Sequence, residues 1–254
     1  MGTGIFVRLV FILNKILAAF NLNFIPPWRK VLFIEVGLDE DINIKEKLAK
    51  LVECNLTDDF FFLQIGANDG VSFDPIHQLV TRYKLKGICI EPIEEYFQEL
   101  TITYKNLPNV KLIQKAVTDK IGTRVMYKVD SSLRSSLPEW SKGIASLNSN
   151  HHKRSGINSN YIIPEEVETI SFDGLITGAQ IEQLDLLVID AEGYDIEIIK
   201  SIDFNKIKPR IIFFEHKILD NVVKSEDLSD VINNLNLKGY LVYIGRNEVL
   251  AFLP

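Results

Sequence analysis

The segment Phe60–Gly70 combines a mostly apolar run with a glycine-containing loop that could hold a nucleoside-bearing ligand. Residues 60–65 have the composition of a buried strand, and Gly66 and Gly70 follow it four residues apart. Glycine lets a backbone turn sharply and approach a ligand closely. Glu91 comes 21 residues after Gly70, which is near the offset at which an acid on the next strand reaches a ribose hydroxyl.

The polar residues of this loop indicate which nucleoside-bearing ligand it suits. A dinucleotide site uses Gly-x-Gly-x-x-Gly, but Asn68 stands in place of the second glycine, and the carboxylate of Asp69 would repel a phosphate. A carboxylate suits a cation or a zwitterion, such as the amino end of S-adenosylmethionine. The alternative is that the glycines form a plain connection between a strand and a helix.

A second group of candidate residues follows two later apolar strands. Asp190 and Glu192 end the segment Leu184–Glu192, and His216 follows the strand Arg210–Glu215. Because ligands of open parallel sheets bind at the carboxyl ends of strands, we expect these side chains near Asp69. We predict His216 as the leading general base, with Asp190 and Glu192 beside the reacting groups.

Other roles are open for the same residues. Asp190 could cap the following helix. Asp190, Glu192, Glu215 and His216 could converge on Mg²⁺ or Mn²⁺, although their spacing does not require a metal. The other candidates for the base are His151 and His152 in the polar segment 131–161. Such a long polar segment between core strands predicts a lid over the site, with a passive surface loop as the alternative.

The elements that must position these residues alternate between strand and helix. Strands are predicted at 60–65, 86–91, 110–117, 184–190 and 210–215, with a further short strand at 123–129 and helices between most of them. This alternation predicts a mostly parallel sheet with helices on both faces. The last strands, 240–244 and 248–252, are joined by Gly245-Arg246-Asn247, which favours a terminal antiparallel hairpin.

Five short motifs in order make this chain resemble the FkbM-type methyltransferases. They are Ile65–Gly70, Glu91-Pro92, Thr169–Leu175, Val188–Gly193 and Phe214–His216. The resemblance implies the class I methyltransferase fold and S-adenosylmethionine-dependent O-methylation of a hydroxyl on a sugar, a glycan or a polyketide.

The resemblance also implies roles for individual residues. Gly66, Asn68, Asp69 and Gly70 would line the methionine end of the cofactor, Glu91 would bind its ribose, and Asp119 would lie near its adenine. Gln64 departs from the family pattern, which more often has an acid ahead of the glycine loop. Two other functions are considered: a nucleotide-dependent oxidoreductase, which Asn68 and Asp69 disfavour, and a non-catalytic module with a methyltransferase fold.

The composition limits the partners and the compartment. A chain of 254 residues with 46% hydrophobic residues can form a sizeable core, and its net charge of −6 argues against general nucleic-acid binding. Two cysteines form no disulfide framework or zinc site, so we expect a reducing, cytoplasmic location.

The amino-terminal segment differs from the rest of the chain. No acidic residue precedes Glu35, and residues 5–25 are strongly apolar but interrupted by Arg8 and Lys15. This pattern disfavours a helix that spans a membrane. It favours a helix that contacts a membrane surface or a protein partner, with packing on its own domain as the alternative. We therefore predict an arm at 1–30 and a methyltransferase domain at 31–254, with the lid-like insertion at 131–161.

Overall fold

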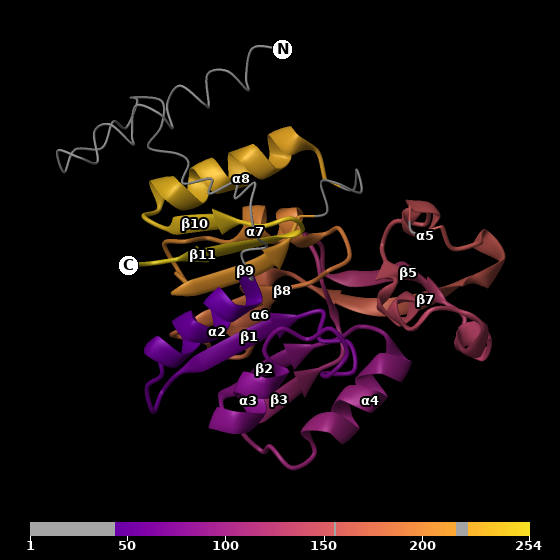
Figure 1. The fold of residues 1–254 in the computed structure, drawn as a ribbon, viewed down its shortest axis with the longest axis horizontal. Helices are drawn as coiled ribbons and strands as arrows, with labels where there is room; N and C mark the ends of the chain where they lie inside the picture. The colour runs from indigo at the N-terminus through magenta and orange to yellow at the C-terminus, as the bar shows by residue number, and fades with distance from the viewer. Residues whose placement is uncertain (1–43, 155, 217–222) are drawn as a thin grey trace. The chain divides into compact units, whose positions relative to one another are not determined.

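The computed structural model describes residues 44–154, 156–216 and 223–254 (Figure 1). The predicted arm at 1–30 lies outside these residues. No helix in the described part of the chain is long and apolar enough to cross a membrane.

The main sheet has seven strands and the topology that positions the site. Its strands lie in the order β10-β11-β9-β8-β1-β2-β3. The bounds are β1 Phe61–Ile65, β2 Lys86–Ile90, β3 Val110–Ile113, β8 Leu186–Ile189, β9 Ile211–Glu215, β10 Leu241–Ile244 and β11 Glu248–Phe252. Neighbours from β3 to β9 pair in parallel, whereas β11 pairs antiparallel with both β9 and β10. The predicted parallel sheet with a terminal hairpin is therefore confirmed.

Helices connect these strands and bury apolar stripes against the sheet. They are α2 Ile44–Cys54, α3 His77–Tyr83, α4 Glu94–Tyr104, α6 Phe172–Gly178, α7 Asp195–Ser201 and α8 Ser225–Leu237. Helix α2 shows the pattern: Ile44, Leu48 and Val52, spaced four apart, are all buried. They share one core cluster with strand residues that include Phe62 and Phe213. Burial of these side chains fixes the strands whose ends carry the site.

A second sheet of four strands lies to one side of the main sheet (Figure 1). It consists of β4 Ala116–Val117, β5 Gly122–Val129, β6 Ala145–Ser146 and β7 Ile162–Ile170, in the order β4-β7-β5-β6. The prediction of one continuous strand over Val110–Val117 is therefore wrong. The chain leaves the main sheet after Ile113, and Ala116 and Val117 pair with β7 instead. Lys115, which lies in this crossing, forms an exposed ion pair of 2.6 Å with Glu168 in β7.

Short helical turns occupy most of the polar segment 131–161. They are η1 Ser131–Ser136, η2 Glu139–Gly143, α5 His151–Arg154 and η3 Ser159–Tyr161. A small buried cluster of Val129, Ile144 and Ile157 packs beneath them, with Leu137 and Tyr161 against it. The segment thus has an apolar core of its own, which holds it in a defined position.

Candidate functional site

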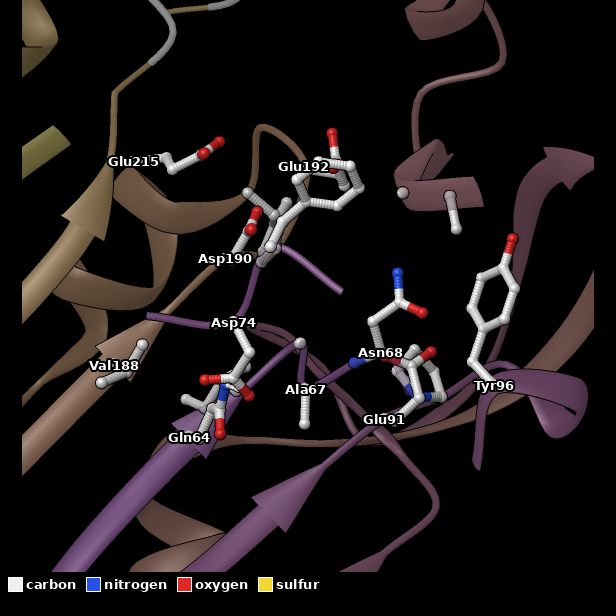
Figure 2. Close-up of a pocket in the computed structure, with 18 of the residues that line it drawn as sticks. Gln64, Ala67, Asn68, Asp74, Glu91, Tyr96, Val188, Asp190, Glu192 and Glu215 are labelled. Carbon is white, nitrogen blue, oxygen red and sulfur yellow. Dashed lines mark hydrogen bonds between the residues drawn. The ribbon is translucent and has the colours of Figure 1, made fainter. Parts of the chain in front are cut away.

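A pocket of about 280 Å³ opens at the carboxyl ends of strands β1, β2, β8 and β9 (Figure 2). Gly66 and Asn68 follow β1, Glu91 follows β2, and Asp190 and Glu192 follow β8, and all five residues line the pocket. Figure 2 shows Asp190, Glu192 and Glu215 on the β8–β9 side, with Glu91 and Tyr96 on the opposite side. The structure therefore brings these predicted residues together at the edge of the sheet where ligands bind in open parallel sheets.

The two loop glycines are required for packing within the protein. Both have positive φ, +79° at Gly66 and +75° at Gly70. A Cβ atom at Gly66 would lie 1.8 Å from the backbone oxygen of Asp190, so this glycine lets the β1 loop approach the β8 turn. A Cβ atom at Gly70 would lie 2.7 Å from the Leu100 side chain in α4. Gly66 lines the pocket and Gly70 does not.

The carboxylate of Asp69 organises the loop and does not line the pocket. Its Oδ1 accepts hydrogen bonds from the backbone N–H groups of Val71 and Ser72, at 2.9 and 2.7 Å. Its Oδ2 lies 2.5 Å from the ammonium of Lys142 in η2. Burial raises the pKa of Asp69, but the hydrogen bonds from Lys142, Ser72 and Val71 outweigh this effect and hold the pKa at about 2. Asp69 is therefore ionised and ties the polar insertion to the loop.

Asn68 and Glu91 form the wall of the pocket between β1 and β2. Asn68 has a φ of 49°, and its backbone N–H donates to Oε2 of Glu91 at 2.9 Å. The N–H of Ile93 donates to Oε1 of Glu91, also at 2.9 Å. Burial raises the pKa of Glu91 to about 7, against the opposing effect of these two hydrogen bonds.

An unsatisfied polar atom on this wall matches a ligand with hydrogen-bond donors. Oδ1 of Asn68 is buried and accepts no hydrogen bond within the described part of the chain. Buried polar atoms normally have a partner. The ribose hydroxyls and the ammonium group of S-adenosylmethionine are donors of the required kind.

The turn after β8 holds Glu192 in a strained conformation beside the insertion. Glu192 has a φ of 49°, which is uncommon for a residue other than glycine. Asp195 at the start of α7 accepts hydrogen bonds from Ala191 and Gly193 in this turn. Ser146 donates to the backbone oxygen of Glu192 at 2.9 Å, and Nε2 of His151 lies 3.0 Å from its carboxylate. The insertion thus fixes an acidic side chain at the pocket wall.

Besides Asp69 and Gly70, two further predicted site residues lie outside the pocket lining. His216 is buried, its ring Nε2 lies 3.3 Å from the Gly245 oxygen, and burial lowers its pKa. The carboxylate of Asp119 accepts a hydrogen bond from the hydroxyl of Tyr194 at 2.7 Å. Tyr194 itself lines the pocket, so Asp119 contacts a residue of the pocket lining without lining the pocket itself.

Sequence reasoning missed several residues of the pocket. The additional polar and aromatic ones include Phe73, Asp74, Tyr96, Trp140, Tyr194 and Glu248. Asp74 lies four residues after Gly70, just before a helical pattern. An acid at such a position is a sequence signal for the start of a helix, and this signal could have drawn attention to Asp74. Among the described residues, there is no cluster of three or more His, Cys, Asp or Glu side chains that could hold a metal ion.

The fold and the site define the class of protein. A parallel sheet in this strand order, closed by an antiparallel hairpin and carrying its pocket at the carboxyl edge, is the class I methyltransferase architecture. The model of the methyltransferase FkbM domain matches residues 64–242, so this chain belongs to the FkbM methyltransferase family. Its cofactor is S-adenosylmethionine.

Similar solved structures are distant in sequence. An FkbM methyltransferase from Methylobacillus flagellatus is 13% identical, with a TM-score of 0.47, over 88% of this chain and 47% of that one. A precorrin-6y C5,15-methyltransferase from Geobacter metallireducens is 13% identical, with a TM-score of 0.40, over 87% and 92% of the two chains. A putative caffeoyl-CoA O-methyltransferase from Staphylococcus aureus is 11% identical, with a TM-score of 0.41, over 99% and 98%. No curated protein matches the sequence.

Proposed function

We propose that this protein transfers the methyl group of S-adenosylmethionine to a hydroxyl of a sugar, glycan or polyketide-like acceptor. The observation that supports this proposal is the acidic side of the pocket, where Asp190, Glu192 and Glu215 lie beside the glycine loop. Carboxylates accept hydrogen bonds from hydroxyl groups and repel anionic groups. This side therefore suits a neutral acceptor that carries hydroxyls.

The residues of the opposite wall would hold the cofactor. Glu91 would bind the ribose hydroxyls, and Oδ1 of Asn68 would accept a hydrogen bond from the bound molecule. When bound, S-adenosylmethionine supplies a methyl group on a positively charged sulfur. The protein's main contribution is then to align the acceptor oxygen with that methyl group and to remove the hydroxyl proton.

Glu192 is the side chain best supported as the group that accepts this proton. It lines the pocket, whereas His216, the candidate favoured by the sequence, does not. The ring of His151 lies 3.0 Å from the carboxylate of Glu192 and would keep it oriented. A carboxylate in this position can act as a general base when it lies within hydrogen-bond reach of the acceptor hydroxyl.

The insertion at 131–161 would act as a lid over the acceptor. Trp140, Gly143, Ala145 and Leu147 from this segment line the pocket. Lys142 attaches it to the glycine loop, and His151 and Ser146 attach it to the β8 turn. Such a segment excludes water from the reaction and can contribute to the choice of acceptor.

The test combines binding with turnover. The purified protein should bind S-adenosylhomocysteine and methylate at least one member of a panel of free sugars, oligosaccharides and polyketides, detected by mass spectrometry. Glu192→Gln should lower kcat by about 10²–10⁴-fold, the loss expected for a general base, with little change in affinity for S-adenosylhomocysteine. A loss in His216→Ala but not in Glu192→Gln would assign the base to His216. Binding without turnover across the panel would favour a non-catalytic module.

We also propose that residues 5–25, which lie outside the described residues, attach the protein to a membrane surface or a partner. The apolar segment with its basic residues Arg8 and Lys15 supports this. The full chain should pellet with anionic vesicles in a salt-sensitive way, and a chain that begins at Trp28 should stay folded and not pellet. Equal pelleting of both chains would contradict the proposal.

A further inference from the structure

Gln64 and Asp74 form a polar pair in the floor of the pocket. Gln64 is the fourth residue of β1, and Asp74 follows the glycine loop. Nε2 of Gln64 donates to Oδ2 of Asp74 at 2.9 Å, and both residues line the pocket. Figure 2 shows the two side chains next to one another, on the same side of Asn68 as Asp190. A carboxylate therefore lies at the floor of the cofactor pocket, directly after the loop.

Within the described part of the chain, backbone N–H groups fix this carboxylate and no ion pair neutralises it. Oδ1 of Asp74 accepts hydrogen bonds from the N–H groups of Ile76 and His77, both at 2.7 Å. Oδ2 accepts a hydrogen bond from the side-chain amide of Gln64, which carries no charge. None of the ion pairs among the described residues involves Asp74. Burial raises the pKa of Asp74, and these hydrogen bonds offset that effect only in part. An ionised carboxylate in such surroundings is stabilised by a cation from the ligand.

The cofactor has two cationic groups, and they make different demands on a protein. An ammonium group carries three N–H donors, which a carboxylate oxygen can accept. A sulfonium group carries no donor, and its methyl group must face the acceptor. The acidic acceptor side of the pocket is formed by the turns after β8 and β9, whereas Asp74 belongs to the connection between β1 and α3.

We propose that Asp74 binds the α-ammonium group of the methionine part of S-adenosylmethionine, and that Gln64 is a positioning residue that holds Asp74 in place. The proposal rests on S-adenosylmethionine as the cofactor. Glu91 lies on the opposite wall of the pocket, where the proposed function has it bind the ribose hydroxyls instead. Selectivity for the complete amino-acid end of the cofactor would then depend on a residue after the glycine loop.

The test removes one partner at a time, the carboxylate from the protein and the amino group from the ligand. Binding of S-adenosylhomocysteine and of its analogue with hydrogen in place of the α-amino group is measured by calorimetry for the wild-type chain and for Asp74→Asn. Asparagine keeps an oxygen for the N–H groups at the start of α3. We expect Asp74→Asn to weaken binding of S-adenosylhomocysteine by about 10- to 100-fold, the loss typical of a charged hydrogen bond. The analogue should bind both proteins within about threefold of each other.

The controls separate this inference from the assignment of the cofactor. Asp227→Asn removes a carboxylate that pairs with Lys200 away from the pocket lining, and it should leave both affinities unchanged. Equal losses for both ligands in Asp74→Asn would show that Asp74 only supports the loop, and no loss would also overturn the proposal. Should Asp74→Asn fail to fold, Gln64→Met should give a smaller loss, again confined to S-adenosylhomocysteine. A wild-type chain that binds neither ligand would overturn the cofactor assignment, and this inference with it.

Discussion

The ammonium of Lys142 lies 2.5 Å from Oδ2 of Asp69 and joins two segments that are far apart in the sequence. Lys142 belongs to η2 of the insertion, and Asp69 belongs to the loop after β1. Lys142 also contacts the carboxylate of Glu99 in α4. Because the Asp69 carboxylate holds the N–H groups of Val71 and Ser72 as well, one buried acid fixes both the loop and the segment above it.

This network predicts that Asp69 stabilises the fold above its own pKa. Asp69 has a pKa of about 2 in the folded protein, below its ordinary value of 3.8. The stabilisation is therefore complete above pH 3.8 and is lost as the pH falls through about 2. Asp69→Asn should lower the free energy of unfolding at pH 7 by about 1–3 kcal/mol, measured by urea denaturation. The difference from wild type should begin to shrink below about pH 4.

The exposed ion pair between Asp227 and Lys200 provides the matched control. Asp227→Asn should change the free energy of unfolding by less than about 1 kcal/mol, since exposed pairs contribute little. Equal effects of the two substitutions at pH 7 would contradict the structural role of Asp69.

Glu91 should show the opposite dependence on pH. Its pKa rises from 4.5 to about 7 on folding, so the unfolded chain binds fewer protons between these values. Stability of the ligand-free protein should fall as the pH rises through this range, by about 1–3 kcal/mol. Glu91→Gln removes the titration, so urea denaturation from pH 5 to pH 8 should show the variant gaining stability relative to wild type. A constant difference across that range would mean that Glu91 does not titrate there.

Gly66 should be intolerant of even the smallest side chain. A Cβ atom would lie 1.8 Å from the Asp190 oxygen at a φ of +79°, so Gly66→Ala combines a clash with backbone strain. We expect a loss of more than about 3 kcal/mol in the free energy of unfolding, or no folded protein at all. Gly178→Ala is the control, because no atom lies within 4 Å of its added Cβ. It should leave stability unchanged or raise it by up to about 1 kcal/mol.

The lid proposal predicts a change at Trp140, which lines the pocket and is 44% exposed. The chain has two tryptophans, so Trp28→Phe leaves Trp140 as the only one. Binding of S-adenosylhomocysteine together with an acceptor should lower the quenching of Trp140 fluorescence by acrylamide, because a closed lid shields the ring from solvent. Unchanged quenching with both ligands bound would show that the segment does not close.

The sequence was sufficient to predict the main sheet because its strands are apolar runs with clear ends. It was insufficient for β7, where Pro164 and Glu165 interrupt the apolar character. The available signal was the alternation of buried Val167 and Thr169 with exposed Glu166 and Glu168. Without β7, the second sheet could not be predicted, and β4 was assigned to the strand before it.

The positions of candidate residues that follow strands could be predicted, whereas the contacts between side chains could not. The carboxyl edge of a parallel sheet is fixed by topology, so Asp190 and Glu91 could be placed from their strands. The sequence does not show that Asp69 would bind Lys142, or that His216 would lie against Gly245, because both contacts depend on distant segments. The glycines were expected to approach the cofactor, but their added Cβ atoms would meet Asp190 and α4.

The position of β11 between β9 and β10 has a consequence for the order in which the domain can be completed. This strand pairs with Ile211–Glu215 on one side and Leu241–Ile244 on the other, yet it is synthesised after both. While the ribosome is still making residues 248–252, the edge of β9 that faces away from β8 has no partner strand. Without β11 between them, β10 cannot join the sheet in its final position. The sheet therefore closes only after translation has passed Phe252, and until then its exposed edge is open to pairing with other chains.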